Sequence, residues 1–176
     1  RRGNCFNGLY SMTFIVMGVA GCGKSTVGKL LADTLGWKYI EGDEYHPEEN
    51  VKKMSSGIPL NDDDRNGWIV SIRTEIEKAK VKGESIVLGC SALKEKYRAI
   101  LRKNDDDITF VFLKGSFEII QQRLEKRAHH FMKAGMLQSQ FDALEEPADA
   151  LVCEVTMTPE EIVHHVLNKM HISTKV

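Results

Sequence analysis

The sequence predicts an α/β fold with three layers, in which a five-stranded parallel sheet carries helices on both faces. Short apolar runs of strand length alternate along the 176-residue chain with segments whose apolar residues recur at helical spacing. The first apolar run, at residues 13–17, leads into a glycine-rich stretch and then into such a helical segment. Strand, glycine loop and helix in this order indicate a site for phosphate groups.

Residues 18–26 fit the pattern G-x-x-x-x-G-K-[ST] of a phosphate-binding loop, or P-loop. Its glycines let the backbone wrap closely around phosphate oxygens with N–H groups pointing inward, and the following helix adds its positive end. Lys24 is expected to reach the β- and γ-phosphates of ATP, and the Ser25 hydroxyl to bind Mg²⁺. The predicted nucleotide-binding residues of this loop are Gly18, Gly21, Gly23, Lys24, Ser25 and Thr26.

The predicted helices begin at residues that favour a helix N-terminus. Asn61 or Asp62 can cap a long helix at 63–82. Ser116 can cap the helix after the fourth strand, and Thr158 opens a capping box. Apolar residues recur on one side of each segment. Further helices are expected, in chain order, at 24–35, 46–54, 93–101 and 136–144.

Four more strands complete the predicted sheet. The run at 85–90 is continuously apolar, as is typical of a buried parallel strand. Ligands of such sheets bind beyond the carboxyl ends of the strands, so the residues that follow each strand matter most. The other predicted strands lie at 37–40, 108–113 and 150–155.

Polar residues follow the second strand. Asp43 is expected to face the phosphate loop, where it either accepts a proton from an attacking hydroxyl or caps a turn. Glu41 either orients Mg²⁺ through water or is a solvated carboxylate. His46 either bonds a substrate or caps the helix that begins near Pro47.

Further polar candidates lie around the third strand. Arg65 either clamps an anionic group of the substrate in a bidentate fork or pairs with neighbouring acids at the surface. Lys94 and Arg98, four residues apart on one helix, are either substrate contacts or a solvated face. Ser91 either faces the nucleotide or caps that helix.

Arg123 and Arg127 are also four residues apart, and a stretch without strand character follows them. This arrangement predicts a small mobile lid at about 124–136 that closes on ATP and neutralises charge during phosphoryl transfer. The alternative is a pair of salt bridges to nearby acids. His129 and His130 are adjacent and do not share a helix face, so a metal site is not favoured there.

Composition excludes several classes of function. The formal net charge is −1 and no basic stripe with interleaved aromatic residues occurs, which argues against nucleic-acid binding. No apolar run is long enough to span a bilayer. The four cysteines form no C-x-x-C pair, which favours reduced thiols and a cytoplasmic location. Residues 1–11 are expected to be an unstructured tail or a processed transit segment, whose removal would allow an organelle instead, before a single domain at 12–176.

Several stretches resemble the gluconokinase family of P-loop small-molecule kinases, which is related to shikimate kinase and the nucleoside-monophosphate kinases. The resemblance covers nearly everything from residue 14 to residue 155 and is most specific at 42–50, 57–65 and 90–94. It implies ATP-dependent phosphorylation of D-gluconate at its terminal hydroxyl, giving 6-phospho-D-gluconate, by a protein that is typically a homodimer. It also implies a five-stranded core like that of the nucleoside-monophosphate kinases.

The resemblance also implies roles for the candidate residues. Asp43 is the acid that faces the hydroxyl, the sugar acid lies among His46, Arg65 and Lys94, and Arg123 contacts ATP from the lid. The expected catalytic residues are Lys24, Asp43 and Arg127; the expected substrate-binding residues are Asp43, His46, Arg65, Lys94, Arg98 and His130.

The chain departs from the family pattern at three positions. Glu41 stands where Asp is usual, Gly67 where Pro is usual and His129 where Gly is usual. These changes bear on rate and lid motion more than on reaction class. Two alternatives remain: a kinase of the same fold that acts on shikimate or a nucleoside monophosphate, and a non-catalytic module that binds ATP.

Overall fold

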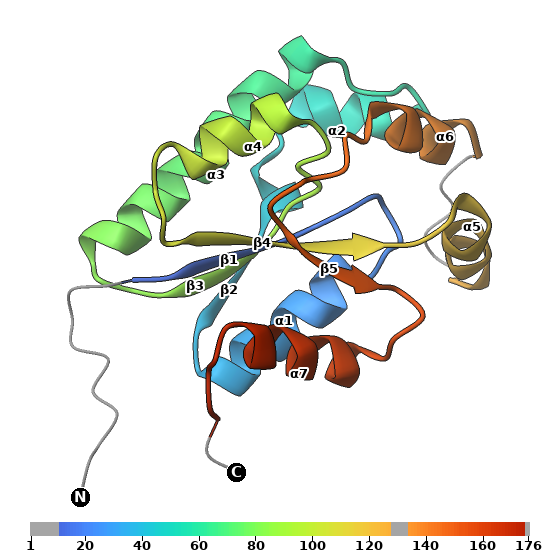
Figure 1. The fold of residues 1–176 in the computed structure, drawn as a ribbon. Helices are drawn as coiled ribbons and strands as arrows, with labels where there is room; N and C mark the ends of the chain where they lie inside the picture. The colour runs from blue at the N-terminus through green and yellow to red at the C-terminus, as the bar shows by residue number, and fades with distance from the viewer. Residues whose placement is uncertain (1–10, 128–133, 175–176) are drawn as a thin grey trace, which may run out of the picture.

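Five parallel strands form one sheet between two layers of helices in the computed structural model, which describes residues 11–127 and 134–174 (Figure 1). The strand order is β2-β3-β1-β4-β5, and every neighbouring pair is parallel. The predicted α/β architecture is therefore confirmed. The strands are β1 (Thr13–Met17), β2 (Lys38–Glu41), β3 (Ile86–Gly89), β4 (Ile108–Lys114) and β5 (Leu151–Glu154).

Seven α-helices and one short 3-10 helix are assigned among the described residues, and each expected helix is present. They are α1 (Lys24–Leu35), η1 (the 3-10 helix Gly42–Tyr45), α2 (Glu48–Ser55), α3 (Asp62–Val81), α4 (Glu95–Arg102), α5 (Phe117–Lys126), α6 (Ala134–Ala143) and α7 (Pro159–Lys169). Within residues 11–127 and 134–174, none of the helices combines the length and apolar character that crossing a membrane requires.

The central strand β1 contributes to two hydrophobic cores because its side chains alternate across the sheet. Phe14 and Val16 pack in the core that contains residues of α1 and α7. Ile15 and Met17 pack in the core that contains residues of α3 and α4. Figure 1 shows these two helix pairs on opposite faces of the sheet. The continuous burial of β1 explains its unbroken apolar sequence.

Most helix boundaries agree with the sequence, and the starts of α2 and α4 differ. Asn61 is the N-cap of α3, since its side chain accepts from the Asp64 N–H at 2.8 Å. Ser91 does not cap α4: the N-cap is Lys94. The helix expected from 46 begins at Glu48, because His46 and Pro47 have extended backbone. The expected caps Ser116 and Thr158 are confirmed.

The predicted N-terminal tail reaches one residue too far. Residues 1–10 lie outside the described part of the chain, whereas Ser11 is only 8 % exposed. The backbone N–H of the next residue, Met12, donates to the Ser85 hydroxyl at 3.0 Å. This contact joins the start of β1 to the approach to β3.

We predict that Gly67→Ala stabilises the protein by about 0.5–1 kcal/mol. Gly67 lies on the exposed side of α3, and a Cβ there would meet no atom within 4 Å. Alanine therefore gains helix propensity without a clash. Urea unfolding of both proteins measures the difference.

Gly28→Ala is the matched control on α1, because a Cβ there would lie 2.5 Å from the Tyr39 ring. We expect it to lower the free energy of unfolding. A destabilised Gly67→Ala protein would contradict the assignment of this position as open helix surface.

Candidate active site

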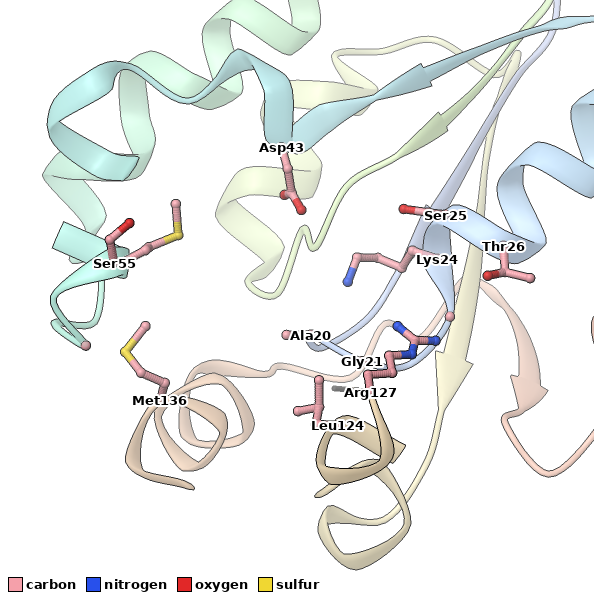
Figure 2. A pocket seen from close by; sticks show the side chains of 13 residues that line it. Ala20, Gly21, Lys24, Ser25, Thr26, Asp43, Ser55, Leu124, Arg127 and Met136 are labelled. Atoms are coloured by element: carbon pink, nitrogen blue, oxygen red, sulfur yellow. The ribbon is translucent and has the colours of Figure 1, made fainter. Parts of the chain in front are cut away.

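A cavity of about 410 Å³ opens at the carboxyl edge of the sheet (Figure 2). It lies between the phosphate loop, the segment after β2, the end of α2, and the facing helices α5 and α6. Parallel α/β folds place ligands at this edge. Its lining residues are Ala20, Gly21, Gly23, Lys24, Ser25, Thr26, Asp43, Met54, Ser55, Gly57, Leu124, Arg127 and Met136.

The phosphate loop needs its glycines for two different reasons. Gly18 has φ 147°, and a Cβ there would lie 2.9 Å from the carbonyl oxygen of Leu113, so both backbone and space exclude a side chain. Gly23 has φ 99° as the N-cap of α1 with open space around it, so the backbone conformation alone favours glycine. The loop thereby presents the N-terminus of α1 to the cavity.

Lys24 closes over its own loop. Its ammonium group donates hydrogen bonds of 3.0 Å to the carbonyl oxygens of Gly18 and Val19. Figure 2 shows its side chain extending into the cavity, on the side where the Asp43 carboxylate also points. An ammonium group held there provides a positive charge for phosphate oxygens.

Asp43 lies in η1, directly after β2, and its carboxylate enters the cavity from the side opposite the phosphate loop (Figure 2). Water reaches the side chain, but the surrounding protein removes part of its hydration, which raises the pKa of the carboxyl group. Lys24 lowers the same pKa and Glu41 raises it, each less than the loss of hydration. A carboxylate with a raised pKa is a better proton acceptor at neutral pH.

Ser25 is held by a carboxylate that also binds a tyrosine. The Ser25 hydroxyl donates to Glu41 Oε2 at 2.5 Å, and the Tyr39 hydroxyl donates to the same oxygen at 2.9 Å. Burial raises the pKa of Tyr39, so its proton stays in place. Since the Ser25 proton points to Glu41, the oxygen lone pairs remain available. Such oxygen donors fit Mg²⁺, which takes one or two protein oxygens together with substrate phosphates.

His46 is fixed as a neutral imidazole beside the cavity. Its ring stacks on Trp68 with centroids 4.1 Å apart, and loss of hydration, with the nearby charge of Arg65, lowers its pKa to about 4. The Asn50 amide nitrogen donates to the carbonyl oxygen of Asp64 at 2.7 Å and lies 3.1 Å from His46 Nδ1. Nδ1 must therefore accept, which leaves the proton on Nε2 as a donor.

Lys94 contacts the Asp62 carboxylate at the start of α3, whereas Arg65 contacts Tyr97. Lys94 donates to an Asp62 oxygen at 3.0 Å, and Lys96 and Tyr97 also donate to this carboxylate. These bonds hold the pKa of Asp62 well below its usual range. Arg65 lies beside the Tyr97 hydroxyl. Of the expected substrate-binding residues, Asp43 lines the cavity, whereas His46, Arg65 and Lys94 are not among its lining residues.

The expectation that Arg98 contacts substrate is wrong. The side chain is 1 % exposed, and its guanidinium donates to the carbonyl oxygens of Ala92 at 2.7 Å and Glu145 at 2.8 Å. It also bonds Glu95 at 3.1 Å. Buried charges need such partners. Arg98 therefore joins the loop after β3 to the segment after α6.

The two arginines of α5 and its C-terminus take different positions. Arg127 lines the main cavity and also a neighbouring hollow of about 260 Å³. Arg123 lines only this hollow, where its guanidinium donates to the carbonyl oxygen of Val155. Thr26 contributes to both spaces. Residues 128–133 of the expected lid, which include His129 and His130, lie outside the described part of the chain.

Sequence reasoning missed two residues that hold the site together. Gln140 of α6 accepts a hydrogen bond of 2.6 Å from the Ala20 N–H of the phosphate loop. Its neighbours Leu137 and Phe141 follow the helical period and indicate only a packing face. The sequence predicts only that Tyr39 belongs to a short strand, whereas in the structure its hydroxyl bonds the Glu41 carboxylate. The bond between Gln140 and Ala20 spans 120 residues, so no local pattern contains it.

Comparisons with known proteins show which family this chain resembles. The family model described as shikimate kinase matches residues 20–171. A probable gluconokinase of Rattus norvegicus is 43% identical over 88% of this chain and 89% of its own length. A gluconokinase of Arabidopsis thaliana is 40% identical, covering 92% and 93%. A crystal structure of a gluconokinase from Sinorhizobium meliloti 1021 superposes with a TM-score of 0.83 at 40% identity, over 92% and 93% of the two chains.

We predict that His46 makes stability depend on pH between about 6.5 and about 4. In this range the unfolded chain binds a proton at His46 and the folded protein does not, so stability is fully present above pH 6.5 and falls as the pH is lowered. In urea unfolding at pH 7, 6 and 5, His46→Gln should lose stability less steeply than the parent. His164→Gln, on the exposed side of α7, is the matched control. Parallel slopes for His46→Gln and the parent would refute this assignment.

We predict that Arg98→Met lowers the free energy of unfolding by about 1–3 kcal/mol for each carbonyl oxygen left without its partner. Lys94→Met is the matched comparison on the same segment. It removes a half-exposed ion pair with Asp62 and should cost less than about 1 kcal/mol. Chemical denaturation gives both values, and equal stability of the two variants would return Arg98 to the candidates for substrate binding.

Proposed function

Because the chain belongs to the gluconokinase family, among kinases related to shikimate kinase, we propose that it transfers the γ-phosphoryl group of ATP to the terminal hydroxyl of D-gluconate. One observation carries this proposal beyond family membership. A phosphate loop with its lysine and a carboxylate of raised pKa face each other across a single cavity. Phosphoryl transfer to an alcohol needs one group that holds the phosphates and another that accepts the proton of the hydroxyl.

The phosphate groups of the nucleotide bind to the phosphate loop. The inward N–H groups and the positive end of α1 hold the phosphates, and Lys24 exchanges its carbonyl partners for phosphate oxygens. The adjoining hollow, with Arg123 and the segment between β5 and α7, accepts the rest of the nucleotide. Ser25 and, through water, Glu41 would hold Mg²⁺, which neutralises charge on the β- and γ-phosphates when bound.

The transfer step uses Asp43 as base. The gluconate hydroxyl gives its proton to the Asp43 carboxylate as its oxygen forms a bond to the γ-phosphorus. The bond from this phosphorus to the bridging oxygen breaks, and ADP keeps that oxygen. Lys24 and Arg127 line the cavity and offset the negative charge that develops during transfer.

The sugar acid is bound by the group beside the cavity. We assign its carboxylate to Arg65, beside the Tyr97 hydroxyl, and to Lys94, which bonds Asp62. The Nε2–H of His46 donates to a sugar hydroxyl, since the ring is neutral. His130, from the expected lid at about 124–136, completes this set in the proposal. A homodimer and a reducing compartment such as the cytoplasm are parts of the same proposal; the buried free thiols of Cys22, Cys90 and Cys153 are compatible with that compartment.

We predict that ADP release depends on gluconate and not on shikimate or AMP. Lys24→Met should lower kcat by about 10²-fold or more, because a charge aimed at the transition state is lost. Asp43→Asn should lower kcat by about 10²- to 10⁴-fold, because no base accepts the proton. A coupled assay for ADP measures all rates.

Lys82→Met, at the exposed C-cap of α3, is the matched control and should turn over as the parent does. Strong turnover with another acceptor and none with gluconate would overturn the substrate assignment. Tight ATP binding without turnover on any acceptor would favour a non-catalytic module instead.

A further inference from the structure

The phosphate loop is tied to a helix that lies far away in the sequence. The Ala20 N–H donates to the side-chain oxygen of Gln140 at 2.6 Å, across 120 residues. Ala20 lies in the first half of the loop and lines the cavity. Its amide is held by a side chain from outside the loop, whereas Cys22 donates to a carbonyl within the loop, that of Val19, at 3.3 Å.

The helix that carries Gln140 is itself held at several points. Leu137 is 1 % exposed in the core, and Phe141 packs edge-to-face on Phe117 of α5 with centroids 5.6 Å apart. Just after the helix, Glu145 donates its backbone N–H to Leu93 at 2.8 Å and accepts from the Glu95 N–H at 3.1 Å. These contacts fix the position of α6 and therefore of the Gln140 backbone.

We propose that Gln140 is a positioning residue for the nucleotide site, which holds the Ala20 end of the phosphate loop in its binding conformation before ATP arrives. The loop contains three glycines with positive φ and would otherwise lose much conformational freedom on binding. A bond that fixes this freedom in advance reduces the cost of ordering the loop. The proposal takes only the nucleotide from the proposed function and does not depend on the acceptor.

Gly21, the residue after Ala20, has no room for a side chain. A Cβ there would lie 2.7 Å from Leu124 of α5, the helix against which α6 packs. The first half of the loop is thus confined on one side by Leu124 and tethered on another by Gln140. Loss of the Gln140 hydrogen bond would leave only the steric contact with Leu124 to confine the loop.

Calorimetric titration with ADP tests the proposal directly. Gln140→Met keeps the length of the side chain and removes the acceptor, so we expect the Kd for ADP to rise about five- to tenfold. Gln138→Met is the matched control two residues away, where an exposed side chain bonds only Asp142 at 2.8 Å, and its Kd should equal that of the parent. An unchanged Kd in Gln140→Met would overturn the proposal.

Hydrogen exchange of the Ala20 amide, measured without nucleotide, separates positioning from a general loss of folding. Exchange should accelerate in Gln140→Met and stay slow in Gln140→Glu, whose carboxylate can accept the same bond. Equal acceleration in both variants would overturn the proposal, because the acceptor would then not matter. Neither measurement uses an acceptor substrate, so absent gluconate turnover in the parent would defeat the proposed function and leave this test intact.

Discussion

The site depends on one constraint, which is that the backbone between β1 and α1 must turn sharply so that the N-terminus of α1 faces the cavity. The turn is confined by the ends of two neighbouring strands. The Gly18 N–H donates to the Ser91 carbonyl after β3 at 3.3 Å, and the Leu113 carbonyl of β4 leaves no space for a Cβ at Gly18. A central, fully buried β1 provides both neighbours. The strand order of the sheet is thus a requirement of the loop as well as of the core.

Two polar side chains of this loop are held in place by hydrogen bonds. Lys24 is held by loop carbonyl oxygens, and Ser25 is held by Glu41. Asp43 makes no such bond to a cation of residues 11–127 or 134–174, and the effect of burial on its pKa exceeds the opposing effect of Lys24. The group with the raised pKa is therefore the one proposed to accept a proton. The groups proposed to hold phosphate and cation are restrained by hydrogen bonds to neighbouring oxygens.

The sheet, the phosphate loop and the position of Asp43 could be predicted because each rests on a local pattern. A buried parallel strand reads as an apolar run, and the residue after it must lie at the ligand edge. Arg98 shows where this reasoning ends. Its spacing from Lys94 on one helix places the two side chains on related faces, but only the tertiary fold decides that one reaches solvent and the other reaches the carbonyls of Ala92 and Glu145. For Gln140 the error is the opposite one, because sequence reasoning overlooks a contact that exists. A polar residue beside a packing face does not reveal which residue it bonds.

Glu41 illustrates how a change at one position depends on others. It stands where the resembling family has Asp, and its longer side chain brings one oxygen to both the Ser25 and Tyr39 hydroxyls. The Tyr39 ring fits only because two glycines flank it: a Cβ at Gly28 would lie 2.5 Å from the ring, and one at Gly89 would lie 2.3 Å from the hydroxyl. Two donors on one oxygen restrict the carboxylate to a single orientation. The longer Glu41 side chain therefore still holds the Ser25 hydroxyl in one orientation. The reaction class is compatible with either acid.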